Sequence, residues 1–318
     1  MVKNILEFFE NYIVIVILLL FITLFSIIAE DFFSLNNFLN ILLQSVIYGI
    51  MSIGMTILII NGYYDLSVGT VMCLSANLAV GLQPFGDFVA VFCALLSGLL
   101  MGLINGVLTA KVKLNAFVVT LATMTGVRGL VYMYNKEDAL AGTSSNFVKW
   151  GESNFLGIST SVWIFIILLL VGEFILRKTV HGRNTYATGS NEIAAKNAGI
   201  NTDKTTLYNF VICSFMAALG GIFQAVRLNA STPTLGWPDL QMVIIACVAL
   251  GGTKLSGGYG DMFRTLGGVL LITVFQNAMD MMSIQSYYKT LMTGLILIVI
   301  ITLDKYLIKT KPRGKYQS

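Results

Sequence analysis

The residues best suited to chemistry lie in a short polar interruption between two apolar runs. The stretch NGYYDLSVG, residues 61–69, places a carboxylate at Asp65. Because a carboxylate toward the middle of a membrane helix costs about 2.5–3.5 kcal/mol, it should pair, face a cavity or lie at the rim. Three roles fit. Asp65 can lie in a cytoplasmic turn, solvated or capping a helix from Leu66 through the N–H groups of Ser67 or Val68. It can line a polar pathway beside a broken helix, or hold a coupling proton or cation.

A second candidate is the small-residue segment GRNTYATGSNEIAAKNAGIN, residues 182–201, in the polar connection after the sixth apolar run. Asn191 or Ser190 can cap a short helix that runs through Ala198, with an acid in its first turn and Gly199 after its end. A helix of small residues suits a groove on a partner protein. The alternative is a linker helix at the membrane interface.

Charged side chains inside the apolar runs form a third group of candidates. Arg128 falls in the fifth run, close to its outer end. Snorkelling, or a structural pair with a carboxylate such as Asp280, is favoured there over contact with a solute. Glu173 and Arg177 are four residues apart in the sixth run, so we expect them to pair near the cytoplasm.

The sequence offers no constellation for catalysis or metal binding. His181 is the only histidine, and the four cysteines fall inside apolar runs without CxxC or Cys/His spacing. The segment GGTKLSGGYG, residues 251–260, has its lysine before the second glycine pair, so it is not a phosphate loop. We therefore expect neither an enzyme nor a bound cofactor, and any ATP would be bound by another subunit. The net charge of +4 reflects basic loops and does not indicate nucleic-acid binding.

Membrane helices must position these candidates. The 318 residues are 56% hydrophobic and 11% charged, with a mean hydropathy of +0.80, whereas soluble domains carry about 25% charged residues. The sequence predicts an all-α polytopic membrane protein, with residues 1–318 forming a single transmembrane domain. About ten spans match the ~20 residues that cross a bilayer, at 12–29, 38–60, 66–83, 88–110, 116–134, 161–178, 206–227, 239–252, 265–282 and 287–303.

The loop charges orient this bundle. With the N-terminus inside, the basic loop residues on the outer side are Lys136, Lys149, Arg227 and Lys289, and the other basic loop residues are cytoplasmic. The positive-inside rule therefore places both termini in the cytoplasm and the chain in the plasma membrane as a multi-pass protein. The glycine-rich residues 251–268 form an inner connection whose small side chains permit close helix approach.

Four blocks of the chain resemble, in the same order, the ribose-type sugar permeases of ATP-binding cassette (ABC) importers. The resemblance extends from about Leu39 to Asp304. In the first block, Tyr63 and Tyr64 replace a small residue and an aliphatic one of the family's usual Gly-Gly-Ile-Asp-Leu-Ser. The blocks are NGYYDLSVGT (61–70), GLINGVLTAKVKLNAFVVTLATMTGVRGL (102–130), GRNTYATGSNEIAAKNAGIN (182–201) and ALGGTKLSGGYGDMFRTLGGVLL (249–271).

The resemblance implies a permease subunit with an architecture like that of the vitamin B12 importer. Its implied partners are a second permease copy, cytoplasmic ATP-binding cassette subunits and an extracytoplasmic sugar-binding protein. It also implies that the short helix within residues 182–201 docks on the ATPase. The residues assigned to this coupling are Gly189, Asn191, Glu192, Ala194, Ala195, Gly199 and Ile200.

The implied cargo is ribose or a similar pentose or hexose. Because such a sugar is uncharged, we expect it to need only weak hydrogen bonds along its path. Branched-chain amino acids or nucleosides are alternative cargoes for the same architecture, and an ion-coupled secondary transporter that uses Asp65 is the alternative mechanism. The predicted path residues are Asn61, Asp65, Ser67, Asn105, Thr120, Thr123 and Asn277.

Overall fold

Helices form almost all of the ordered structure in the computed structural model, which describes residues 2–236, 238–295 and 298. The long helices are α1 (Val2–Ile28), α2 (Leu35–Ile60), α4 (Asp87–Gly106), α5 (Ala116–Asn135), α7 (Thr160–Lys178), α10 (Thr202–Leu228) and α12 (Met262–Met281). The shorter helices are α3 (Val68–Gly81), α6 (Ser145–Glu152), α8 (Val180–Ser190), α9 (Glu192–Asn197) and α11 (Leu240–Leu250). A 3₁₀ turn, η1 (Gln83–Phe85), precedes α4, and a π-helical turn, η2 (Val107–Lys111), continues it.

The helices agree with the predicted spans. Each expected span from 12–29 to 265–282 coincides with a helix. Six helices of the described chain are long and apolar enough to cross a membrane, namely α2, α4 with η2, α5, α7, α10 and α12. The all-helical membrane fold class is therefore confirmed, whereas the number of spans and the cytoplasmic termini stay predictions. Most of the tenth expected span, 287–303, lies outside the described residues.

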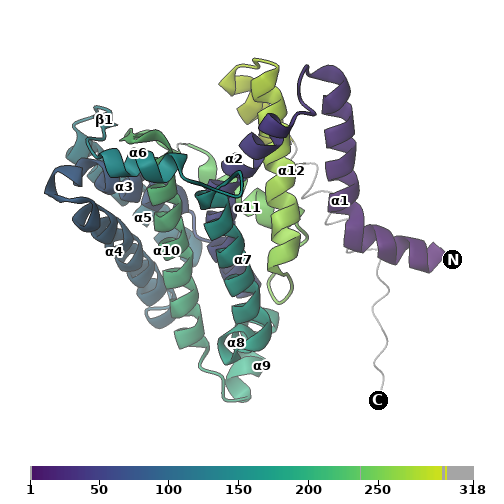
Figure 1. Ribbon diagram of the computed structural model, residues 1–318. Helices are drawn as coiled ribbons and strands as arrows, with labels where there is room; N and C mark the ends of the chain where they lie inside the picture. The colour runs from purple at the N-terminus through teal and green to yellow at the C-terminus, as the bar shows by residue number, and fades with distance from the viewer. Residues whose placement is uncertain (1, 237, 296–297, 299–318) are drawn as a thin grey trace.

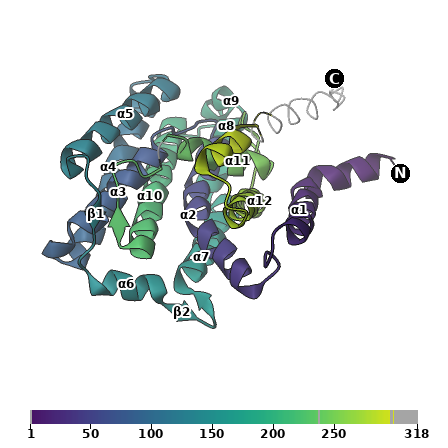
Figure 2. The same ribbon diagram turned by 90° about the horizontal axis from the view of Figure 1, so that it is seen from above.

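Helix α10 lies at the centre of the bundle, where it packs against α2, α3 and α4 (Figures 1 and 2). Its contact with α4 runs through Gly98, Gly102 and Gly106, which are spaced four residues apart. A Cβ atom at Gly102 would lie 2.7 Å from the Cα of Val211, and one at Gly98 would lie 2.7 Å from the Ser214 carbonyl oxygen. These glycines therefore bring the two backbones together, as small residues do in membrane helix pairs.

Irregular backbone precedes both of the short helices α3 and α11. Before α11, residues 229–236 run beside α3 and α5 without a helix. The amide nitrogen of Asn77 donates to the Thr232 carbonyl at 3.2 Å. Non-helical backbone is tolerated at membrane depth only where protein or a water-filled cavity satisfies it. Side chains of α3 and α5 supply that satisfaction here.

Arg128 on α5 is the main donor to this irregular segment. Its guanidinium is bonded to the carbonyls of Pro233 and Leu235, and only 7% of the residue is exposed. The prediction that Arg128 snorkels or pairs with Asp280 is therefore wrong, and Asp280 forms an ion pair with Lys289. The physical reason is that the carbonyls of residues 229–236 have no helix of their own and require a buried donor.

The other predicted ion pair and glycine contacts are confirmed. Arg177 Nε lies 3.0 Å from Glu173 Oε1, and the second Glu173 oxygen accepts from the Met262 N–H at the start of α12. A Cβ atom at Gly268 would lie 2.0 Å from the Cys247 carbonyl oxygen. The glycine-rich stretch therefore allows α11 and α12 to approach closely.

The two ends of the bundle differ. At one end lie α6 and two short antiparallel pairs, formed by β1 (Leu140–Ala141) with β4 (Ala230–Ser231) and by β2 (Asn154–Phe155) with β3 (Ile158–Ser159). Helices α8 and α9 lie at the opposite end (Figure 1). The segment predicted to couple to a partner is thus on the far side from the predicted outer loop.

Replacing Gly102 by valine tests the close contact between α4 and α10. The new side chain would enter the space of the Val211 backbone, so we expect overpacking to lower the free energy of unfolding by about 1–3 kcal/mol. The measurement is the apparent melting temperature of the detergent-solubilised protein. Gly126→Val on α5 is the matched control, because nothing lies within 4 Å of a Cβ atom there. Equal losses in both variants would contradict the role of the contact.

Candidate functional site

The carboxylate of Asp65 is fully buried and is surrounded by hydrogen-bond donors. Its Oδ1 atom accepts from the Ser67 N–H at 2.8 Å and from the Ser67 hydroxyl at 2.6 Å. Its Oδ2 atom accepts from the Asn105 amide at 3.3 Å and from the Ser214 hydroxyl at 3.2 Å. Complete burial raises the pKa of the Asp65 carboxyl, and the hydrogen bonds from Ser67, Asn105 and Ser214 oppose that rise.

This network joins four parts of the bundle. Asn105 near the end of α4 also donates to the Ser67 hydroxyl at 3.0 Å and accepts from the Thr123 hydroxyl of α5 at 2.6 Å. Ser214 belongs to α10. The turn between α2 and α3 is thereby tied to α4, α5 and α10. We call Asp65, Ser67, Asn105, Thr123 and Ser214 the Asp65 network.

The structure decides part of the question raised by Asp65. The solvated form of the turn is wrong, because none of the residue's surface is exposed. The predicted hydrogen bond from the Ser67 N–H is present, but Ser67 is itself the N-cap of α3, which begins at Val68, so Asp65 closes the turn before the helix and does not cap it. The network unites Asp65, Ser67, Asn105 and Thr123 of the predicted path residues.

The remaining predicted path residues have other partners. Asn61 donates to the Thr206 hydroxyl at 2.9 Å, and the Thr120 hydroxyl donates to the carbonyl of Ala116 in its own helix. Asn277 lies on α12 and takes no part in the Asp65 network. Ser214 was missed by the sequence reasoning, where the signal available was a hydroxyl next to Cys213 within an apolar helix.

The predicted coupling helix is present as α9. The Asn191 side chain accepts from the Ala194 N–H at 3.0 Å and caps it, and Ala195 is buried while Gly199 follows with a φ of +83°. The predicted start and end are therefore confirmed within about one residue, which is the usual uncertainty of helix ends. An ion pair joins Lys196 to Glu192 at 2.8 Å within the helix, and the hydrogen bond that Lys196 donates to the Glu192 carboxylate raises the pKa of the Lys196 ammonium.

A junction of three glycines fixes this segment to the membrane helices. A Cβ atom at Gly189 would lie 1.8 Å from the Ile60 carbonyl oxygen, and one at Gly257 would lie 3.0 Å from the Cα of Gly62. The Ile60 carbonyl itself accepts from the Gly258 N–H at 2.8 Å. The end of α8 is thus in backbone contact with the end of α2 and with the loop that leads to α12. We call Gly62, Gly189 and Gly257 the glycine junction.

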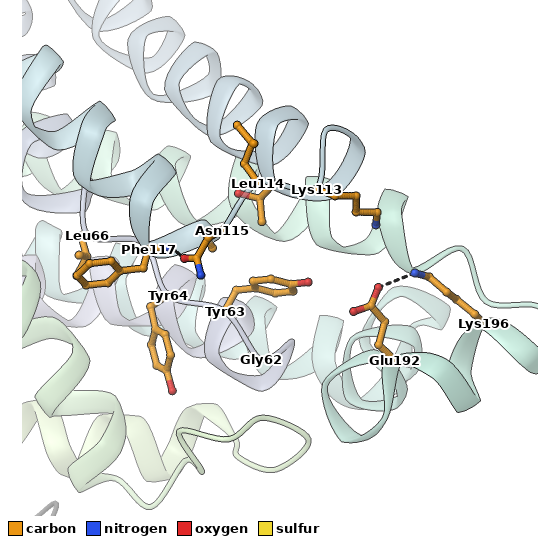
Figure 3. A pocket seen from close by; sticks show the side chains of 12 residues that line it. Gly62, Tyr63, Tyr64, Leu66, Lys113, Leu114, Asn115, Phe117, Glu192 and Lys196 are labelled. Carbon is orange, nitrogen blue, oxygen red and sulfur yellow. Dashed lines mark hydrogen bonds and ion pairs between the residues drawn. The ribbon is translucent and has the colours of Figure 1, made fainter.

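A cavity of about 380 Å³ opens between the α2–α3 turn, the connection from α4 to α5, and α9 (Figure 3). Its walls combine aromatic rings with amide, hydroxyl and charged side chains. The lining residues are Gly62, Tyr63, Tyr64, Leu66, Thr109, Lys113, Leu114, Asn115, Ala116, Phe117, Glu192 and Lys196.

The Asp65 network, the glycine junction and the cavity can transmit motion between helices and can offer hydrogen bonds to a neutral molecule. Among the residues that the structure describes, no group of three His, Cys, Asp or Glu side chains could hold a metal ion. The polar groups instead form a buried network, a backbone junction and a half-open pocket at one end of the bundle. Such features connect helices mechanically and offer hydrogen bonds to a solute.

The chain is similar over nearly its full length to curated transport proteins. It is 38% identical to the ribose import permease protein RbsC of Haemophilus influenzae, covering 91% of each chain. It is 35% identical to RbsC of Bacillus subtilis, covering 91% of this chain and 90% of that one. It is 33% identical to the L-arabinose transport system permease protein AraH of Escherichia coli, covering 90% and 88%. No solved structure matches it.

A protein family model also matches most of the chain. The family described as "Branched-chain amino acid transport system / permease component" matches residues 37–301. That range extends from α2 past the end of α12, and it includes the Asp65 network, the glycine junction and α9. The chain therefore belongs to this family of membrane transport permeases.

Proposed function

We propose that this chain is the membrane-spanning permease of an ABC importer that carries a monosaccharide, with a pentose such as ribose as the favoured cargo. The observation that carries the proposal is the similarity to ribose and arabinose import permeases over about nine-tenths of the chain. The chain is a multi-pass inner-membrane transport subunit and not an enzyme. ATP hydrolysis belongs to a separate subunit.

Sugar is favoured over the cargo named in the family description. That description names branched-chain amino acids, but the similar curated proteins are named for ribose and L-arabinose. The buried Asp65 network consists of neutral amides and hydroxyls around one carboxylate that is already saturated. Neutral polar groups suit an uncharged polyol better than an amino acid with two charges.

Helix α9 is the element through which ATP-binding cassette subunits would act. Its apolar residue Ile193 is 74% exposed at the tip of the α8–α9 segment, where a groove on a partner could bury it. Through the glycine junction, displacement of α8 would move the end of α2 and the turn that carries Asp65. A displacement of α8 by the ATP-binding subunits would thus be passed to the Asp65 network and to the helices that this network joins.

The path would lie between this chain and a second permease copy, with an extracytoplasmic sugar-binding protein delivering the sugar. One face of α5 carries Gly126 and Gly129, whose Cβ positions have no atom of the described residues within 4 Å, beside the exposed Leu130 and Met133. In the arrangement described here the polar groups of the Asp65 network bond to one another. We infer that tilting of α5 would expose them to passing sugar.

An ion-coupled secondary transporter remains the alternative mechanism. It would use the Asp65 carboxyl as its proton or cation site. The described surroundings of that carboxyl are hydroxyl and amide donors, which satisfy a carboxylate without a metal ion. This donor set favours a structural carboxylate and an external energy source.

Gly189→Ala tests the path of coupling. The added methyl would collide with the Ile60 carbonyl and separate α8 from α2. We expect ATP hydrolysis by the assembled transporter to continue while sugar uptake per inserted molecule falls at least tenfold. Gly294→Ala, at a position with no described atom within 4 Å of the added Cβ atom, is the control and should transport normally. Unchanged coupling in Gly189→Ala would argue against the junction.

Labelling at Ile193 tests the orientation. Ile193→Cys should react with a membrane-impermeant maleimide in inside-out vesicles and stay unlabelled in right-side-out ones. The native Cys73, Cys213 and Cys247 are buried, and the partly exposed Cys93 is replaced by serine in this variant, so that native thiols add little background. Reaction from the outside only would overturn the cytoplasmic assignment of α9 and the coupling mechanism with it.

Asp65→Asn and Asp65→Ala separate the structural role from ion coupling. Asparagine keeps an oxygen acceptor, so uptake should stay within about tenfold of the parent and show no dependence on an imposed proton or sodium gradient. Alanine leaves the surrounding donors unpaired, at about 1–3 kcal/mol for each buried group, and should lower the melting temperature. Asp280→Asn, at an exposed pair, is the control. Gradient-driven sugar flux by the purified chain alone, abolished in Asp65→Asn, would support the secondary transporter instead.

A further inference from the structure

The 380 Å³ cavity beside α9 has the size of a small-molecule site. Such sites span about 300–1,000 Å³ and combine apolar walls with a few placed polar groups. This cavity belongs to the α8–α9 end of the bundle, where imported solute would leave the permease (Figure 1). Its chemistry can therefore be compared with that of the proposed cargo.

Aromatic rings form two of its walls, and contacts behind them hold the rings in place. The Tyr64 hydroxyl donates to the Leu255 carbonyl, and the Tyr63 ring lies 6.0 Å from the ring of Phe210 in the core. Phe117 at the start of α5 also lines the cavity, with its side chain largely exposed. Rigid aromatic faces can cover the C–H faces of a sugar ring at little cost in side-chain entropy.

Polar groups with unused hydrogen-bonding capacity line the same cavity. Thr109 is 4% exposed, and its buried hydroxyl oxygen has no hydrogen-bond partner within the described structure. This oxygen is itself closed off from solvent, so a ligand in the cavity would bond to it only after the Thr109 side chain turns. Thr109 lies on the π-helical turn η2, a local structure often found at functional sites. The Asn115 amide nitrogen points toward the rings of Tyr63 and Tyr64 (Figure 3).

The charged groups of the cavity are already neutralised within the chain. Lys196 pairs with Glu192 at 2.8 Å, and Lys113 pairs with Asp203 at 2.5 Å. Binding an anion here would have to compete with these pairs, whereas a neutral polyol can accept and donate hydrogen bonds without breaking them. An uncharged ligand can therefore bind beside these exposed pairs without breaking them.

We propose that this cavity is a cytoplasmic monosaccharide-binding site, in which imported sugar bridges α9 to the α2–α3 turn. The inference rests on the proposed function for the identity of the sugar. Glu192 and Lys196 lie on α9, while Tyr63 and Tyr64 lie next to Asp65. A sugar between them holds α9 against the turn and slows the next transport cycle, so accumulated product lowers its own import.

The test uses the permease assembled with its ATPase subunits in lipid nanodiscs, without the sugar-binding protein. Binding of radiolabelled ribose should be saturable in the millimolar range, and Tyr63→Ala and Asn115→Ser, which keeps a capping oxygen for α5 but removes the amide donor, should each weaken it at least fivefold. Tyr208→Ala removes an exposed tyrosine outside the cavity and is the matched control. Ribose 5-phosphate should bind more weakly than ribose.

The outcomes separate this inference from the proposed function. No saturable binding, equal binding in both cavity variants and the parent, or tighter binding of ribose 5-phosphate would each overturn the cavity assignment. ATP-dependent ribose uptake into empty vesicles, measured with the sugar-binding protein, tests the proposed function separately. Uptake without binding at the cavity would refute only the site.

A second measurement tests the feedback. Loading vesicles with ribose should slow uptake by the parent protein at least threefold and should slow uptake by Tyr63→Ala less. Equal slowing of the two proteins would refute the feedback.

Discussion

A carboxylate that is removed from water must have its oxygens satisfied by the protein, and that requirement organises the interior of this permease. Asp65 meets it by drawing donors from its own turn, from α4 and from α10. Asn105 then extends the network to α5. The acid thus lies where four structural elements meet, and each of them is held in register with the turn that contacts the coupling segment.

Close approach of backbones also holds helices against one another, through glycines instead of hydrogen bonds to a carboxylate. Glycines along α4 let α10 come near enough for Ser214 to reach Asp65, and the glycine junction lets α8 touch the end of α2. The two devices are connected in sequence, because Gly62 precedes Asp65 by three residues. Motion at the α8–α9 end and rearrangement of the buried network are therefore parts of one mechanical path.

Local signals in the sequence predicted local structure well. The cap at Asn191 and the glycine at Gly199 were enough to place α9, and the apolar runs located the long helices. Contacts between distant residues left no such signal: a hydroxyl like that of Ser214 looks the same in a sequence whether it faces a carboxylate or its own helix. The partners of Arg128 could not be found either, because they are backbone carbonyls, which every residue carries.

The irregular segment 229–236 has a consequence for biosynthesis. Its carbonyls depend on Arg128 of α5 and on Asn77 of α3, both of which leave the ribosome earlier because synthesis begins at the N-terminus. The donors are thus made before the acceptors that need them. A circularly permuted chain that began at residue 229 would reverse this order, and the segment would enter the bilayer with its polar backbone unprotected.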